Sequence, residues 1–325
     1  MKKIITVLLS AAMLCTAFAA CSESGTDSDS STSSSTSSTS SSEESDDLSS
    51  LSGEATASGS SALKPLADIA VELFADVAPD ALVTVNAGGS GTGLSEVSQG
   101  IVDIGNSDVA AETKLTAEES AELVDHKVCT VTMAACVNTE LGLTSISQED
   151  LIAIYTGEIT NWKDVEGCDV DLEITLYTRP SSSGTRAIFQ MFALNGNDEI
   201  VGMENDNSGE VQTAIKDDIS AIGYLAMSYY MTDENLQALA IDGVEPTLEN
   251  TYNGTYPVWG YEHMYTKGEA EGVAAAFIDF MMGEDFASEI EAAFYGVQLT
   301  SLMRLSKHTM LLKQQLLNKK TNKLD

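Results

Sequence analysis

Residues 179–186 read Arg-Pro-Ser-Ser-Ser-Gly-Thr-Arg and join two segments of different periodicity. The apolar segment before them, 172–177, has the composition of a strand, whereas 187–194 has the spacing of an amphipathic helix. A strand, a glycine-containing loop and a helix in this order form the repeating unit of an α/β protein. The stretch therefore predicts both the fold class and a loop that opens a helix.

The side chains of this loop suit an anion. The first turn of a helix has backbone N–H groups without intrahelical acceptors, and Ser183 and Thr185 add hydroxyl donors beside them. Gly184 lets a ligand approach the backbone, and the guanidinium of Arg179 is a planar fork that fits a tetrahedral oxyanion. Taken alone, the loop is equally compatible with a plain helix cap beside a surface arginine.

Outward from this loop, helices and strands continue to alternate, which predicts an α/β protein with largely parallel sheets. Helices are expected at 63–78, 93–99, 148–155, 210–217 and 269–282, and strands at 82–85, 103–105, 128–137 and 221–225.

Three further segments carry the same chemistry. Ser61 precedes the first expected helix, and Ser90 lies in a glycine-rich turn between a strand and the next helix. Asp108 follows an expected strand, at the end where ligands of open α/β sheets bind. We expect these segments and the Arg179 loop to form one oxyanion pocket.

The N-terminus predicts export and anchoring. Residues 1–20 have the charged start, short apolar run and small-residue exit of a signal peptide, and Phe18-Ala19-Ala20 before Cys21 resembles a bacterial lipobox. Cys21 is therefore the expected lipidation site, on the outer face of the cell membrane. Residues 21–58 are expected to be a disordered Ser, Thr and acidic tether, because they hold too little apolar surface to offset the entropy of ordering.

Charge and cysteines narrow the function class. The net charge of −34 argues against nucleic acid, which needs clustered cations. The negative charge does not exclude an anion site, because salt screens exposed carboxylates that lie more than about 8 Å away. Cys129, Cys136 and Cys168 are expected to be buried apolar residues, with Cys129 and Cys136 on opposite faces of one strand. No cofactor or metal site is expected.

With these segments in view, the chain resembles the phosphate-binding proteins of Pst-type ABC transporters. The resemblance runs from residue 59 to 283 through 59–66, 87–97, 102–108, 154–162, 179–190, 221–224 and 253–257. It implies a type II periplasmic-binding-protein fold, in which two α/β lobes are joined by two crossover strands and clamp the ligand in the cleft between them. Lobe 1 would comprise 59–134 and 260–300, lobe 2 would comprise 135–259, and the crossovers would lie near 130–138 and 257–265.

The resemblance also assigns site residues. It implies that phosphate is bound by eight residues: Ser61, Ala62, Ser90, Asp108, Arg179, Ser183, Gly184 and Thr185. Asp108 would accept the hydrogen that phosphate carries and sulfate lacks, which can discriminate by about 10⁴ to 10⁵. Arg179 is a candidate ion-pair partner for Asp108. The implied partners are phosphate and the permease subunits of the importer, and a monomer that catalyses no reaction is expected.

Two alternatives remain open. The pocket could bind another tetrahedral oxyanion, molybdate or sulfate. Ser61-Ala62-Leu63-Lys64 also fits the Ser-x-x-Lys of penicillin-recognising serine enzymes, with Ser61 as nucleophile and Lys64 beside it, although no Ser-Asp-Asn or Lys-Thr-Gly triplet accompanies it.

The C-terminus departs from the family pattern after about residue 297. Residues 301–325 are rich in lysine and arginine in an otherwise acidic chain. They are expected to form a poorly ordered tail or a loosely amphipathic helix.

Overall fold

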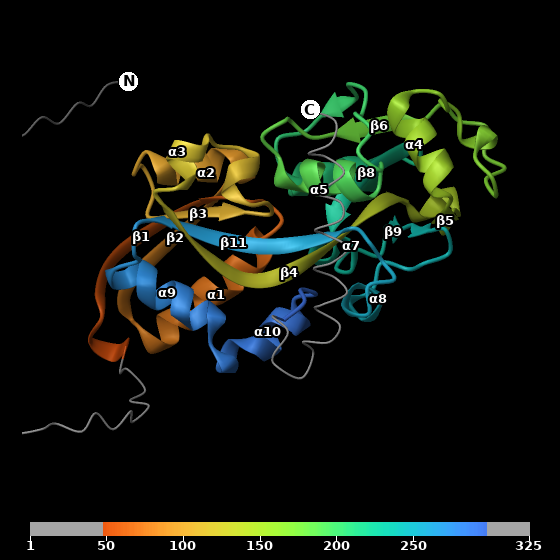
Figure 1. Cartoon of the computed structure of the whole chain (residues 1–325). Coiled ribbons are helices and arrows are strands. Elements are labelled where there is room, and N and C mark those ends of the chain that lie inside the picture. The colour runs from red at the N-terminus through yellow and green to blue at the C-terminus, as the bar shows by residue number, and fades with distance from the viewer. Residues whose placement is uncertain (1–47, 298–325) are drawn as a thin grey trace, which may run out of the picture. The chain divides into compact units, whose positions relative to one another are not determined.

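The structure is a computed structural model that describes residues 48–297 (Figure 1). The expected signal peptide, Cys21, most of the expected tether and the basic tail at 301–325 lie outside the described residues.

The described chain is an α/β protein. Its strands are β1 (Ser52–Gly59), β2 (Asp80–Ala87), β3 (Ile104–Ser107), β4 (Leu123–Asn138), β5 (Ser145–Ile146), β6 (Thr175–Thr178), β7 (Met203–Glu204), β8 (Ala221–Ala226), β9 (Leu236–Ala238), β10 (Ala240–Ile241) and β11 (Trp259–Lys267). Its α-helices are α1 (Lys64–Val77), α2 (Ser90–Ser98), α3 (Ala117–Ser120), α4 (Gln148–Thr156), α5 (Gly184–Phe192), α6 (Ser208–Asp217), α7 (Met227–Tyr230), α8 (Leu248–Tyr252), α9 (Gly272–Met282) and α10 (Ala287–Ala292). Short 3₁₀ turns occupy Leu48–Ser50, Ala111–Thr113, Thr139–Leu141, Trp162–Asp164 and Glu284–Phe286.

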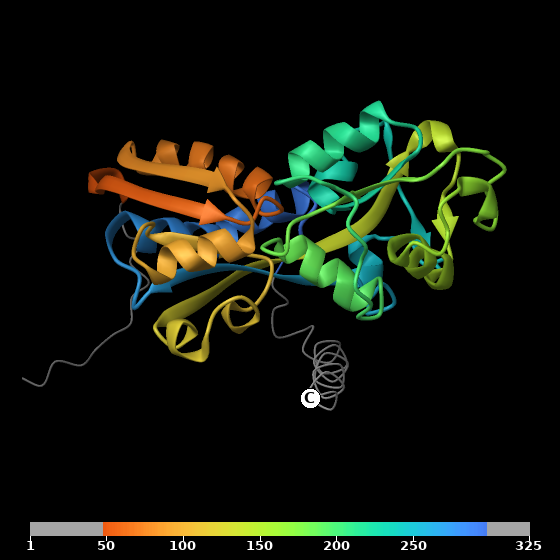
Figure 2. The same ribbon diagram turned by 90° about the horizontal axis from the view of Figure 1, so that it is seen from above.

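One nine-stranded sheet passes through two lobes, which Figures 1 and 2 show beside each other. Its order is β2-β1-β3-β11-β4-β8-β6-β7, and β9 also pairs with β4. The long strand β4 changes partner along its length: 123–132 pair with β11, and 133–137 pair with β8. The segment just before β11 runs next to β4 and is bonded to it: the Met133 N–H donates to the Val258 carbonyl at 3.0 Å. Both links lie within the stretches where the sequence analysis expected crossovers.

The first lobe has a parallel core, in which β1 lies between β2 and β3. Helices α1 and α9 cover one face of these strands and α2 covers the other (Figure 1). Since parallel strands end at one edge, the loops after β1, β2 and β3 all open on the same side.

The expected disordered tether, 21–58, is too long, because its last residues form strand β1. Residues 52–59 pair along their whole length with β2, and Ala55 and Ala57 are buried. Close packing requires the glycine that ends this strand, because a Cβ on Gly59 would lie 2.1 Å from the Asn106 carbonyl oxygen of β3. A strand built from Ser, Ala and Gly lacks the β-branched and aromatic residues that mark strands in a sequence, so its composition resembled that of a disordered segment.

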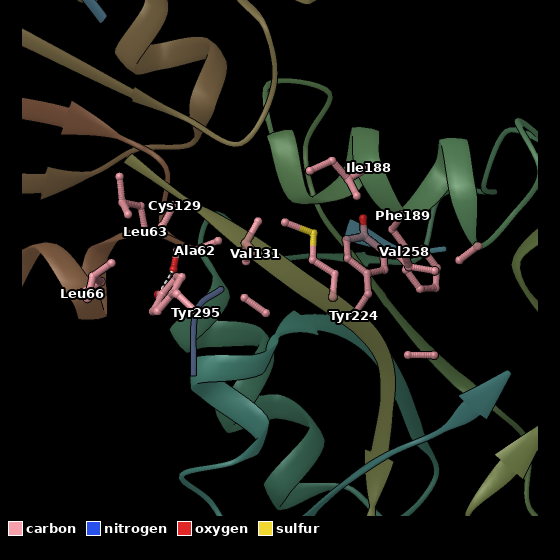
Figure 3. Close-up of a cluster of buried hydrophobic side chains, with 14 of the residues drawn as sticks. Ala62, Leu63, Leu66, Cys129, Val131, Ile188, Phe189, Tyr224, Val258 and Tyr295 are labelled. Carbon is pink, nitrogen blue, oxygen red and sulfur yellow. Dashed lines mark hydrogen bonds between the residues drawn. The ribbon is translucent and has the colours of Figure 1, made fainter. Parts of the chain in front are cut away.

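The second lobe buries both faces of β8. Ile222 and Tyr224 face the main core with Phe189 of α5, whereas Ala221 and Leu225 pack with Val211 and Ile215 of α6. Helices α5 and α6 therefore cover opposite faces of the sheet. Figure 3 shows the main core running without interruption from Leu66 and Cys129 of the first lobe, through Val131, to Ile188 and Phe189 of the second.

The three cysteines of the described region are unpaired and buried, as expected. Cys129 and Cys136 belong to different core clusters on the two faces of β4, which confirms the predicted opposite orientations. None of the helices in residues 48–297 is both long and apolar enough to cross a membrane.

Candidate functional site

The predicted site residues gather where the two lobes meet. The loops after β1, β2 and β3 come from the first lobe, and the loop from β6 into α5 comes from the second. Each lies at the carboxyl end of a parallel strand, and α1, α2 and α5 begin there. The first-turn N–H groups of these helices have no intrahelical acceptors.

Asp108 is the centre of one group of contacts. Its carboxylate accepts the Ser90 hydroxyl on Oδ1 at 3.2 Å and the Thr185 hydroxyl on Oδ2 at 2.8 Å. Its own N–H donates to Ser90 Oγ at 3.0 Å, and its side chain is buried. Since Thr185 belongs to α5, this carboxylate joins the two lobes.

Gly184 makes this approach possible. A Cβ at this position would lie 2.2 Å from Ser90 Oγ and 2.9 Å from Asp108 Cβ, so no side chain fits. The N-termini of α2 and α5 therefore meet almost in contact, and the positive ends of two helix dipoles point at one place. A convergence of this kind favours a bound anion.

Arg179 is the centre of a second group. Its guanidinium donates to the Ser208 hydroxyl at 3.2 Å and, more weakly, to Ser61 Oγ at 3.4 Å. It also donates to the Asn205 and Asp206 carbonyl oxygens, each at 3.0 Å. Burial lowers the pKa of Arg179, while Tyr224 and Asp108 act in the opposite direction. A buried cation of this kind interacts strongly with an anion, because little water screens it.

The expected ion pair between Arg179 and Asp108 does not form. Asp108 takes its hydrogen bonds from hydroxyl groups, and the Arg179 fork is directed at hydroxyl and carbonyl oxygens. The two charges still act on each other through space, because Asp108 raises the pKa of Arg179.

Sequence reasoning missed Ser208. This residue opens α6, is fully buried, and donates its N–H to Ser61 Oγ at 3.1 Å. The signal was present, because Asn207-Ser208-Gly209 repeats the pattern of a cap, a hydroxyl and a glycine at a helix start. A fourth helix N-terminus therefore joins the site.

Arg186 and Glu199 hold the Arg179 backbone. Arg186 donates to the Arg179 carbonyl at 2.7 Å and pairs with Glu199 at 3.1 Å. Tyr224 donates to Glu199 and accepts the Arg179 N–H, each at 3.1 Å. Burial raises the pKa of Glu199 to about 7, although Arg186 opposes that rise. These contacts hold the backbone of Arg179 in a fixed position.

The remaining predicted residues contribute mainly backbone. Ser183 caps α5 by accepting the Arg186 N–H at 3.2 Å, so its hydroxyl oxygen is already engaged. Ala62 is fully buried, and its carbonyl accepts the Tyr295 hydroxyl, as the dashed line in Figure 3 shows. Tyr229 donates to the neighbouring Ser61 carbonyl at 2.7 Å.

The two lobes are closed on each other. Across the junction, the Gly91 N–H donates to the Ser182 carbonyl at 2.8 Å. The Lys114 ammonium donates to the Ser181 carbonyl at 2.7 Å and to that of Ser183 at 3.3 Å, and burial lowers the Lys114 pKa. Together with the Thr185–Asp108 contact, these bonds hold the α5 loop against the first lobe.

Two other kinds of site find no support here. Lys64 donates to both Asp68 carboxylate oxygens at 2.7 Å, and Ser61 contacts Ser208 and Arg179, so the arrangement does not provide Ser61 with a lysine base. Within residues 48–297, no cluster of three or more His, Cys, Asp and Glu side chains could hold a metal ion.

Comparisons with known proteins agree with this geometry. A family model described as a PBP superfamily domain matches residues 29–285. Phosphate-binding protein PstS of Bacillus subtilis (strain 168) is 47% identical over 288 residues, which cover 89% of this chain and 91% of that protein.

Solved structures give the same result. A phosphate ABC transporter substrate-binding protein from Clostridium perfringens with bound phosphate matches with a TM-score of 0.70 and 27% identity, over 76% of this chain and 100% of that one. An ABC-type phosphate transport receptor from Vibrio cholerae matches with a TM-score of 0.58 and 25% identity, over the same shares. The predicted α/β binding-protein fold is thereby confirmed, and the protein belongs to the PBP superfamily and, within it, to the PstS family of phosphate-binding proteins.

Proposed function

We propose that this protein captures inorganic phosphate between its two lobes and delivers it to an ABC importer, without catalysing a reaction. The observation that carries the proposal is the meeting of the α2 and α5 N-termini, from opposite lobes, beside a buried guanidinium. Membership of the PstS family identifies the tetrahedral anion that such a site takes.

Phosphate is held by donors from both lobes. The first lobe supplies the Ser61 hydroxyl and the backbone at Ala62 and at Ser90, the first residue of α2. The second supplies Arg179 and the N–H groups at Gly184 and Thr185, with Ser183 shaping the α5 start, while the Thr185 hydroxyl donates to Asp108. Ser208 extends this set, because it contacts both Ser61 and Arg179. Binding closes the lobes, since neither lobe alone completes the set of donors.

Asp108 sets the choice of anion. A carboxylate next to a fully deprotonated anion is repelled, whereas a phosphate that keeps a hydrogen can donate it to Asp108. Sulfate has no such hydrogen at neutral pH. Because Asp108 is buried, the difference in affinity between phosphate and sulfate is large: a buried acceptor that receives no hydrogen bond from the ligand costs free energy of binding.

The proposal extends to location and partners. The protein acts outside the cytoplasm as a monomer, anchored by a lipid on Cys21 and presented to the permease subunits by the acidic segment that follows. The closed form is what the permease recognises. Labelling of the cell-expressed protein with a fatty-acid analogue tests the anchor, because a Cys21→Ala variant should take up none.

Isothermal titration of the purified protein with phosphate, sulfate and molybdate tests the binding function. We expect phosphate to bind and the other two to bind far more weakly. Arg179→Ala should lose at least about a hundredfold in phosphate affinity, because it removes the buried cation. Asp108→Asn should narrow the preference for phosphate over sulfate. Unchanged phosphate affinity in both variants would remove the site assignment, and preferred binding of molybdate or sulfate would change the ligand.

A further inference from the structure

A second carboxyl group lies buried against Asp108. Glu262 of β11 is 0% exposed, and neither of its carboxylate oxygens has a hydrogen-bond donor in good geometry within the described residues. Gly260, which precedes it by two residues and so faces the same side of the strand, approaches Asp108 closely: a Cβ there would lie 3.2 Å from the Asp108 carbonyl oxygen. Strand β11 therefore presents Glu262 to the site.

The surroundings of Glu262 disfavour a negative charge. Burial raises its pKa well above the ordinary value, and the charge and side chain of Asp108 raise it further. The Ser60 hydroxyl acts in the opposite direction but is a single neutral donor. The other titratable groups that Glu262 influences are Cys129, Tyr229 and Tyr295. None of these is a cation, and each has a pKa raised first by its own burial.

The unpartnered, fully buried oxygens of Glu262 lead to the same conclusion. Two facing carboxylates cannot hydrogen-bond, because both only accept. A proton on Glu262 converts it into a donor, gives Asp108 a partner and removes a charge from a site that binds an anion. An ionised Glu262 would instead leave two buried oxygens unsatisfied and place a second negative charge near the ligand.

We propose that Glu262 is a neutral carboxylic acid that donates its hydrogen to Asp108, and that it thereby fixes Asp108 as an acceptor for the hydrogen of phosphate. Glu262 is thus a positioning residue, which acts on the ligand through Asp108. This inference rests on the proposed function.

A protonated Glu262 also contributes to selectivity. A carboxylate can accept about four hydrogen bonds. Ser90 and Thr185 supply two hydrogens to Asp108, and Glu262 would supply a third. Asp108 can then accept one more hydrogen bond, and the hydrogen of phosphate donates it. Sulfate has no hydrogen for this position and would leave it unfilled.

The test compares two substitutions of similar size in the full chain. Glu262→Gln keeps a neutral donor, whereas Glu262→Met has none. With inorganic phosphate, we expect Glu262→Met to bind about tenfold to a hundredfold more weakly than the wild type, the effect of losing a hydrogen bond to a charged group. Glu262→Gln should recover most of that loss. The ratio of phosphate to sulfate affinity should fall in Glu262→Met and recover in Glu262→Gln.

A pH profile and a spectrum separate this role from simple packing. Phosphate affinity of the wild type should fall as pH rises through the Glu262 pKa, because ionisation removes the donor and adds a charge, and this fall should be absent in Glu262→Gln. The infrared difference spectrum between the wild type and Glu262→Gln should contain the carbonyl band of a protonated carboxylic acid, because the band that Glu199 contributes near neutral pH is common to both proteins and cancels. Thermal melting of each variant checks that it is folded.

Several results would overturn the inference. An increase of about tenfold or more in phosphate affinity in Glu262→Gln would show that the native residue is ionised, because a negative charge would have been removed. Equal affinities and equal selectivity in all three proteins would remove the positioning role. Failure of the wild type to bind phosphate would overturn the proposed function instead, and the infrared band would still report the protonation state of Glu262.

Discussion

The Thr185 hydroxyl donates to Oδ2 of Asp108 at 2.8 Å, and this single bond joins the start of α5 in one lobe to the loop after β3 in the other. Both residues are almost fully buried. The acceptor that we propose selects the ligand is therefore also a contact between the lobes, so closure and the proposed selectivity depend on the same carboxylate.

Replacing Thr185 with valine keeps the shape of the side chain and removes the hydroxyl. We expect phosphate affinity to fall about tenfold, because a hydrogen bond to a charged acceptor is lost. Isothermal titration measures this effect. The matched control is Thr213→Val on the exposed surface of α6, where the hydroxyl only bonds the Gly209 carbonyl. An equal loss in both variants would contradict a specific role.

Gly184→Ala should block full closure. Its Cβ would collide with Ser90 Oγ at 2.2 Å, so the N-termini of α2 and α5 would have to separate. We expect phosphate binding to weaken by at least about a hundredfold, since donor positions matter to a fraction of an ångström. Gly209→Ala, at the start of α6, is the control, because its nearest neighbour would be Asn207 Oδ1 at 3.3 Å. Titration and small-angle X-ray scattering with phosphate present measure the two effects, and a normally closing Gly184→Ala would contradict the prediction.

Lys114 should favour the closed form. Lys114→Met keeps the length of the side chain but removes both bonds to the Ser181 and Ser183 carbonyls. We expect a larger radius of gyration without phosphate and several-fold weaker binding, as a shifted closing equilibrium requires. Lys163→Met, which removes a pair with Asp171 inside the second lobe, is the control. Identical scattering from the wild type and Lys114→Met would reject the idea.

Glu199 should make stability depend on pH. Its pKa is about 7 in the folded protein, above the ordinary 4.5, so the folded state holds more protons than the unfolded state between these values. The free energy of unfolding should therefore decrease as pH rises through this window, by up to about 3 kcal/mol. Glu199→Gln should lack this decrease.

Urea unfolding at several pH values tests the prediction. The quantity to follow is the difference in unfolding free energy between the wild type and Glu199→Gln, because it cancels the contributions of other groups. Glu118→Gln, at an exposed position, should run parallel to the wild type. A constant difference between the wild type and Glu199→Gln across the window would show that Glu199 does not titrate there.

Much of the fold could be predicted because its periodic segments are long. The helices at 148–156 and 184–192 and the strand at 221–226 begin and end close to the expected residues. Strand β1 was missed because it is built from Ser, Gly, Glu, Ala and Thr and has no alternation of large apolar residues to detect. Local patterns do not report how closely a distant helix approaches.

The site was predictable where it is built from helix starts, and less so where it depends on pairing in the sheet. Ser61, Ser90, Asp108, Arg179 and Thr185 each lie in a loop or a first helical turn with a recognisable composition, and the structure brings them into two hydrogen-bonded groups. Glu262 lies in the middle of a strand, and only the pairing of β11 with β3 and β4 brings it to Asp108. The direction of the Arg179 fork likewise depends on the Asn205 and Asp206 carbonyls, which no motif marks.

Tyr295 connects the loop before α1, which contains Ala62, to a segment near the C-terminus. Its hydroxyl bonds the Ala62 carbonyl and, at 3.0 Å, Ser228 Oγ, and the next residue, Gly296, pairs with Thr130. The loop that begins α1 is thus finished by residues made more than two hundred positions later. A growing polypeptide cannot complete the proposed phosphate site until almost all of it has been synthesised, so premature termination before this tyrosine should yield a receptor that folds in part and binds phosphate more weakly.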